Sequence, residues 1–315
     1  MRSIYGIDVA GAHLDVCHVS GSRSKKFENS SKGFSKLSFW AKDAELFVME
    51  ATGTHHVAVA DHLHSQGVAV AVVNPARAKH YGASLGIRNK TDKVDAQVLA
   101  QFAAANQVPA YEPLPEWQKA LRSLVRARER LVRHLASLKV QKQEPEVDAF
   151  VLAQIDASIA FSSEQLKLTM CRIRSLLKSS SVLQAKFALL RSIPGVGEVL
   201  AMTLLAEIGC FERFDNAKKA AAFVGVCPAQ RQSGTKQWVT RMSKAGNAEL
   251  RKALYMPAMA AVRAEGVFKE LYKRLVGKGK SKMSAIGAVM HKLVRVAYGV
   301  LKSGKPFIAE GVAKP

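Results

Sequence analysis

The chain has 315 residues, 48% of them hydrophobic, which is enough for two or three folded domains and excludes a wholly disordered chain. Lysine and arginine outnumber aspartate and glutamate by 47 to 25, and the net charge of +22 favours nucleic acid as the partner, since no basic amphipathic segment marks a membrane-surface protein. No apolar run approaches the roughly 18 residues that cross a bilayer, and four scattered cysteines without a CxxC pair argue against zinc ribbons and disulfides, so we expect a cytoplasmic protein without a membrane partner.

The first 110 residues predict an α/β domain. Its β-type runs lie at 3–10, 13–20 and 25–29, followed by a helix at 33–42, a strand ending at Glu50, a helix at 55–67, a strand at 68–73 and a helix at about 92–105. Three antiparallel-type strands followed by alternating strands and helices give the element order of a ribonuclease-H-like sheet.

Four acidic residues of this domain are candidates for a metal site. Asp8 lies in an apolar strand, where a carboxylate is costly unless it is paired or metal-bound, and Glu50 ends a second strand. Asp92 and Asp95 stand three residues apart and project from one face of a helix. Four converging carboxylates would repel one another, and one or two Mg²⁺ ions would relieve that repulsion and could serve phosphoryl transfer. Helix capping is the alternative for Asp92 and Asp95, but their company with Asp8 and Glu50 favours metal binding.

A proline-rich boundary at 108–117 precedes a helical region, residues 111–188. Leucines at helical spacing run through 116–142, and the pattern resumes at 148–178 after Pro145. Two long helices paired as a hairpin or coiled coil fit this pattern, and a compact helical bundle fits the spacing equally well.

The third region, residues 189–315, carries most of the positive charge. Its Pro-Gly-Val-Gly turn lies between two helical stretches and predicts a helix-hairpin-helix, in which Gly195 and Gly197 would let a DNA phosphate approach free backbone N–H groups. An ordinary tight helical turn is the alternative. The remainder is predicted to be helical, apart from a polar loop at 227–247 and a lysine-rich loop.

Ser233 in the polar loop is a candidate nucleophile. A hydroxyl beside cations and a phosphodiester can attack phosphorus if it is activated, although serine in such loops is far more often a turn former. Ser243 is an equally plausible candidate on local chemistry alone. The predicted phosphate-binding cations around the loop are Arg231, Lys236, Arg241 and Lys244.

Six motifs occur in order along the chain, namely YGIDVAGAHLDV, VMEATGTHH, VVNPARAKHYGASLGIRNKTDKVDAQVLAQF, LRSIPGVGEVLAMTLLAEIG, FVGVCPAQRQSGTKQWVTRMSKAGNAELRKALYMPAM and YGVLKSGKPF. Together they resemble the bacterial insertion-sequence transposases of the IS110 type, which are relatives of the Piv/MooV DNA invertases.

The resemblance implies a RuvC-like domain over 1–110 whose DEDD carboxylates match the four acids above. It also implies a coiled-coil linker over 111–188 used for assembly, so that a homodimer or homotetramer is expected. The transposase domain over 189–315 would supply a catalytic serine that matches Ser233 rather than Ser243. Finally, it implies that a structured bridge RNA pairs with donor and target DNA.

These expectations lead to a DNA recombinase that uses Mg²⁺ and a covalent phosphoserine intermediate. A metal-dependent junction nuclease without a covalent intermediate is the alternative, and a non-catalytic nucleic-acid-binding protein, with its acids as helix caps, is the third reading.

Overall fold

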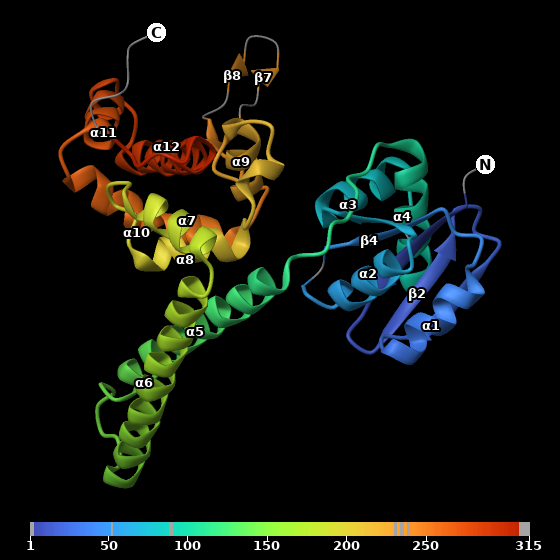
Figure 1. The fold of residues 1–315 in the computed structure, drawn as a ribbon, viewed down its shortest axis with the longest axis horizontal. Helices are drawn as coiled ribbons and strands as arrows, with labels where there is room; N and C mark the ends of the chain where they lie inside the picture. The colour runs from blue at the N-terminus through green and yellow to red at the C-terminus, as the bar shows by residue number, and fades with distance from the viewer. Residues whose placement is uncertain are drawn as a thin grey trace. The chain divides into compact units, whose positions relative to one another are not determined.

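A computed structural model describes residues 3–51, 53–87, 91–229, 232–233, 236–237 and 240–308, with the backbone alone for 232, 236 and 237. The chain divides into an N-terminal unit, Met1–Leu114, and a C-terminal unit, Pro115–Pro315. Figure 1 shows both units in chain order.

The N-terminal unit contains a five-stranded sheet in the order β3-β2-β1-β4-β5. Its strands are β1 (Ile4–Val9), β2 (His13–His18), β3 (Ser24–Glu28), β4 (Leu46–Glu50) and β5 (Ala69–Val73). The first three strands pair antiparallel, whereas β4 pairs parallel with both β1 and β5. The predicted mixed α/β domain is therefore confirmed.

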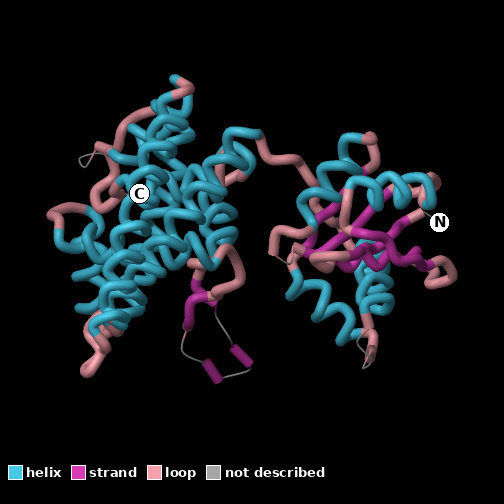
Figure 2. Tube along the Cα trace, turned by 90° about the horizontal axis from the view of Figure 1, so that it is seen from below, coloured by secondary structure: helices cyan, strands magenta, loops and turns pink. Residues whose placement is uncertain are grey.

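Helices cover both faces of this sheet, as Figure 2 shows in cyan around the magenta strands. The helices are α1 (Ser31–Trp40), α2 (His56–Ser65), α3 (Pro75–Ser84) and α4 (Asp92–Ala105). Because side chains alternate along a strand, Tyr5 and Ile7 of β1 join the core beneath α1 and α2. Ile4 of β1 and Val48 of β4 face the other way and pack with α3 and α4.

Gly6 allows α4 to lie directly on β1. A Cβ atom at Gly6 would stand 1.8 Å from the carbonyl oxygen of Ala96 and 2.8 Å from the backbone nitrogen of Ala100. Both atoms belong to the backbone of α4, so a side-chain rotation cannot make room.

Gly6→Ala is therefore expected to lower the free energy of unfolding by about 3 kcal/mol, the upper end of the usual cost of overpacking, because α4 must move off the sheet. Urea denaturation of the full chain measures this loss. Gly11→Ala is the matched control, since its Cβ would meet its nearest neighbour, the His55 ring, at an ordinary 3.6 Å. Equal losses for the two variants would contradict the close-packing role of Gly6.

Helix α3 was not predicted. Asn74 and Pro75 suggest a turn after the strand, but Asn74 caps the helix by accepting a hydrogen bond from the Ala76 N–H at 2.9 Å, and Pro75 occupies the first helical turn. Asparagine followed by proline is also a helix-start signal, which could have revealed this element.

The C-terminal unit is mainly helical, as predicted. Its helices are α5 (Glu116–Gln141), α6 (Ala149–Lys178), α7 (Ser181–Arg191), α8 (Glu198–Glu207), the 3₁₀ turn η1 (Phe211–Arg213), α9 (Ala217–Val224), α10 (Ala248–Arg263), α11 (Val267–Gly277) and α12 (Lys282–Ser303). The described residues between α9 and α10 include the two-residue strands β6 (Pro228–Ala229), β7 (Gln232–Ser233), β8 (Lys236–Gln237) and β9 (Arg241–Met242).

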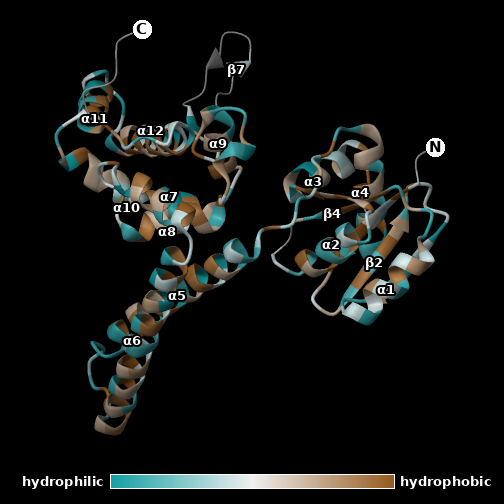
Figure 3. Cartoon of the chain, viewed as in Figure 1, coloured by the Kyte–Doolittle hydropathy of each residue, from teal (hydrophilic) through white to brown (hydrophobic). Residues whose placement is uncertain are grey.

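Helices α5 and α6 form the expected pair of long helices, and Figure 3 shows hydrophobic and hydrophilic residues alternating along them. Leu121 and Val125 of α5, together with Ile173 and Leu177 of α6, belong to the same buried cluster as α8 and α12. One end of the pair therefore shares a core with residues 189–308 instead of forming a separate layer.

Helix α12 is the one helix within the described residues that is long and apolar enough to cross a membrane. More than half of that stretch, 56%, is buried within the chain, where Val289, Leu293 and Ala297 contribute to the core. A buried core helix passes the same test of length and composition, and this burial identifies α12 as such a helix.

Candidate functional site

The sheet directs the predicted acids of β1 and β4 to the face covered by α4. Gly6 contacts α4, and the alternation of side chains places Asp8 on the same side of β1. In the parallel pairing of β1 with β4, Ile7 lies opposite Met49. Asp8 and Glu50 are the next residues on these two strands, so they continue that register as neighbours at the carboxyl end of the strands.

Helix α4 brings the other two predicted acids to this place. Asp92 and Asp95 both lie in its first turn, above the part of α4 that contacts Gly6. The N-cap is Thr91, whose hydroxyl oxygen accepts a hydrogen bond from the Val94 N–H at 3.3 Å. Asp92 is therefore not the N-cap of α4, so the main structural role that the capping alternative gave to this residue is filled by Thr91.

The electrostatics of Asp8 show that the acids lie close enough to influence one another. Burial and, in decreasing order of strength, the negative charges of Asp95, Asp92, Glu50 and Asp15 together raise the pKa of Asp8 to about 6. Such mutual repulsion is what a bound divalent cation would remove. The structure thus brings together the four acids that the sequence singled out.

Two more residues of this face were missed by the sequence analysis. Ligand atoms of His13, Asp15 and Asp92 all lie within 4.8 Å of one another, a spacing that suits a shared metal ion. Asp15 is directly opposite Asp8 in the β1–β2 register and also forms an ion pair with Lys26 at 3.3 Å. The alternation of His13, Asp15 and Cys17 between apolar residues of β2 was the signal that could have placed them beside Asp8.

The candidate serine lies at the far end of the polar loop. Ser233 belongs to β7, pairs with Lys236 of β8, and its side chain is exposed. Ser243 instead follows β9 at the base of the loop, where its N–H donates to the Cys227 carbonyl oxygen at 2.8 Å and its side chain is half-buried. Accessibility therefore favours Ser233 as the residue that could meet a phosphodiester.

The cations predicted around this serine are only partly described. Arg231 lies outside the described residues, and the side chain of Lys236 is not described. Arg241 on β9 and Lys244 are both exposed. Lys244 has a left-handed backbone with φ of 55°, which turns the chain at the base of the loop.

The two glycines of the predicted phosphate-binding turn have different surroundings. Gly195 has a φ of +85°, and a Cβ there would stand 2.7 Å from the Pro257 carbonyl oxygen, so this glycine packs against α10. Gly197 has open space around it and precedes α8. Glu198 already places a carboxylate at the start of α8, where it pairs with Arg174 at 2.7 Å. Gly197 thus has open space at its Cβ position, whereas α10 fills that position at Gly195.

A buried ion pair connects α5 and α8 to the base of the loop. Glu207 is 2% exposed and accepts two hydrogen bonds from Arg126, at 2.9 and 3.1 Å. The side-chain amide of Asn247 donates to the same carboxylate at 3.0 Å, and the Asn247 oxygen caps α10 by accepting from the Leu250 N–H. Asn247 is also the last residue of the polar loop, so Glu207 holds that end in place.

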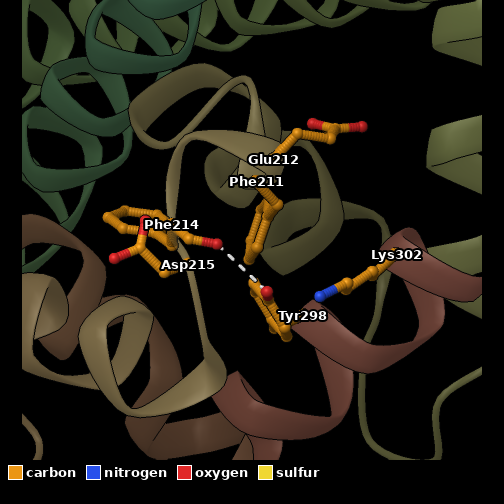
Figure 4. A pocket seen from close by; sticks show the side chains of 6 residues that line it. All are labelled: Phe211, Glu212, Phe214, Asp215, Tyr298 and Lys302. Carbon is orange, nitrogen blue, oxygen red and sulfur yellow. Dashed lines mark hydrogen bonds between the residues drawn. The ribbon is translucent and has the colours of Figure 1, made fainter.

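A small cavity of about 190 Å³ lies where η1 meets the end of α12 (Figure 4). Its lining residues are Phe211, Glu212, Phe214, Asp215, Tyr298 and Lys302. Glu212 pairs with Lys186 at 3.0 Å, Asp215 pairs with Lys219, and the Tyr298 hydroxyl donates to a backbone carbonyl at 3.0 Å. The carboxylates and the hydroxyl of this cavity are therefore engaged within the fold.

Comparisons with known proteins agree with this arrangement. A family model described as Transposase, of the DEDD IS110 type, matches residues 5–144, and a model described as Transposase IS116/IS110/IS902 family matches residues 187–273. The first match includes all four predicted acids, and the second includes Ser233.

Relatives extend over the whole chain. Pilin gene-inverting proteins of Moraxella bovis and Moraxella lacunata are each 31% identical over 318 residues, which cover 97% of this chain and 98% of theirs. The transposase for insertion sequence element IS1111A of Coxiella burnetii is 24% identical over 294 residues, covering 82% of this chain and 78% of its own.

Proposed function

The chain belongs to the IS116/IS110/IS902 transposase family, and we propose from this premise that it is a DNA recombinase in which the acidic site and Ser233 act on the same phosphodiester. Transposases cleave and transfer DNA strands, so the class of reaction follows from the family. The serine nucleophile, the identity of the metal and the guidance by RNA are the parts that we propose.

The observation that carries the proposal is the convergence of carboxylates around Asp8. Oxygen donors of this kind are the ligands that Mg²⁺ prefers, and a carboxyl with a pKa of about 6 among like charges gains stability from a nearby cation. Asp8, Glu50, Asp92 and Asp95 would hold Mg²⁺, with Asp15 as a further oxygen donor. When bound, the metal would stabilise the charge that develops on the oxygens of the scissile phosphate.

Ser233 would supply the nucleophile. A bond forms between its hydroxyl oxygen and phosphorus while the bond from phosphorus to one deoxyribose oxygen breaks; the serine loses its proton and the leaving oxygen gains one. The phosphoserine conserves the energy of the phosphodiester, so the reverse reaction with another strand can reseal DNA without ATP. The exposed position of Ser233 on β7 supports this role.

The remaining partners are also proposals. We propose that the chain acts in the cytoplasm as a homodimer or homotetramer on donor and target double-stranded DNA, with a structured noncoding RNA as the guide. The high positive charge of the chain supports binding to both nucleic acids through their phosphates.

Ser233→Ala is expected to eliminate the covalent protein–DNA adduct, because alanine has no oxygen to bond phosphorus. The adduct is measured by denaturing gel electrophoresis after incubation of the full-length protein with labelled substrate DNA, Mg²⁺ and the element's RNA. Ser243→Ala is the matched control and should form the adduct as the parent does. Undiminished adduct with Ser233→Ala would disprove the role of this serine.

A metal-dependent nuclease without a covalent intermediate is the second candidate, and the DEDD-type domain favours it, because an acidic site can activate water without a serine. The same experiment separates the two functions. The nuclease predicts cleavage by Ser233→Ala at the parental rate and no adduct from either protein.

A further inference from the structure

Helix α12 has one exposed face in addition to its buried one. The residues of this α12 face are Ser284, Ala288, His291, Lys292, Arg295, Gly299 and Lys302, all exposed or half-buried. At 3.6 residues per turn they lie on one side of the helix, opposite the buried Ile286, Val289 and Leu293.

The α12 face is cationic and has no acidic residue of its own. From Leu271 to Ile308 the chain contains Lys and Arg residues but no Asp or Glu. Burial lowers the pKa of His291, and the nearby charges of Arg295 and Lys292 lower it further, so the positive charge of the α12 face at neutral pH comes from its Lys and Arg side chains. The described acids of the neighbouring η1 and the residues after it, Glu212 and Asp215, are already paired with lysines. Like charges gathered in this way favour an anionic partner.

The shape of the α12 face suits an extended partner that approaches closely. Its non-basic members are small, and a Cβ added at Gly299 would meet no atom within 4 Å. From His291 to Lys302 the helix rises about 16 Å, along which a nucleic-acid duplex presents many phosphates. On the same helix, Gly287 lies against Met242 of β9. A Cβ atom added at Gly287 would stand 3.1 Å from the methyl carbon of Met242. The α12 face therefore starts beside the base of the loop that carries Ser233.

We propose that the α12 face binds the sugar–phosphate backbone of a nucleic-acid duplex and forms a docking surface separate from the Ser233 loop. A duplex fits better than an anionic membrane, because the opposite side of α12 is buried in the core and the face carries no large apolar side chain that could enter a bilayer. This inference goes beyond the proposed function and requires neither metal nor catalysis.

The test compares two double charge reversals in the full-length protein. Arg295→Glu/Lys302→Glu alters the α12 face, whereas Lys32→Glu/Lys36→Glu makes the same change of charge on exposed residues of α1, on the opposite side of the sheet from the acids. Fluorescence anisotropy measures the Kd of each protein for 30-base-pair DNA and RNA duplexes, in EDTA, from 50 to 300 mM salt. Circular dichroism and thermal unfolding establish that each variant is folded.

We expect the α12 variant to lose about tenfold in affinity per phosphate contact at 0.1 M salt, and its slope of log Kd against log salt to fall by about one per contact. The α1 variant should keep the parental slope. A loss on either duplex supports the proposal and identifies the bound nucleic acid. Equal slopes for the two variants on both duplexes would overturn it.

Gly299→Glu provides a second variant that removes no cation. Glutamate is a better helix former than glycine and has open space at this position, so the fold should be retained. Its new carboxylate should weaken duplex binding several-fold, and parental affinity in this variant would contradict close contact at the α12 face.

Discussion

Asp8→Asn is expected to lower DNA strand cleavage by on the order of 10³-fold, because a metal ligand that stabilises transition-state charge contributes several kcal/mol. Asparagine preserves the size of the side chain and removes only the charge. Cleavage of labelled substrate DNA at saturating Mg²⁺ measures the effect. Asp156→Asn, an equal change on an exposed residue of α6, is the control and should cleave at the parental rate.

The same variant should be more stable than the parent when no divalent ion is present. The pKa of Asp8 is raised to about 6 from an ordinary value near 4, so the folded protein binds this proton more tightly than the unfolded chain does. The cost of ionising Asp8 is absent below about pH 4, develops as the pH rises through 4 to 6, and is complete above pH 6.

Thermal unfolding in EDTA at pH 7.5 and at pH 4 tests whether ionisation of Asp8 lowers the stability of the fold. Asp8→Asn should gain at most about 3 kcal/mol at pH 7.5 and almost nothing at pH 4. Addition of Mg²⁺ should stabilise the parent more than the variant. A variant that loses both cleavage and stability at pH 7.5 would show that Asp8 serves the fold and not the metal.

Glu207→Ala is expected to destabilise the C-terminal unit by about 2–3 kcal/mol, because the hydrogen bonds to its buried carboxylate are lost while Arg126, whose side chain is 36% exposed, stays partly solvated. Glu207 binds Arg126 through both of its oxygens and also accepts from Asn247, so three hydrogen bonds are lost together. For a unit of this size the loss corresponds to a fall in Tm of roughly 10 °C.

The matched control for this prediction is Glu116→Ala. Glu116 also forms an ion pair from α5, with Lys119 at 2.9 Å, but its side chain is 88% exposed. Such surface pairs contribute less than about 1 kcal/mol, so this variant should unfold within a degree or two of the parent. Similar Tm values for the two variants would exclude Glu207 as a main support of the unit.

The sequence alone could single out Asp8 and Glu50 because strand-end carboxylates in apolar surroundings are conspicuous. Asp8 and Glu50 stand out against buried neighbours, whereas Asp15 does not, because β2 alternates polar and apolar residues as any half-exposed strand does. Its place beside Asp8 depends on the antiparallel register of β1 and β2, which the spacing of apolar residues does not specify.

Other features depended on long-range contacts that local patterns do not contain. Gly195 and Gly197 look equivalent in sequence, and only the packing of α10 distinguishes them. Glu207 sits in an apolar helix with nothing nearby in sequence to pair with it, because its partner Arg126 is 81 residues away.

The buried carboxylate of Glu207 also couples the position of α5 to that of the polar loop. Arg126 holds it from the long helix α5, and Asn247 holds it from the point where the polar loop ends and α10 begins. A sliding or tilting of α5 must therefore displace the end of the polar loop with it or break the hydrogen bonds to this buried carboxylate. A movement of α5 would therefore be transmitted to the polar loop through the hydrogen bonds that Arg126 and Asn247 make with Glu207.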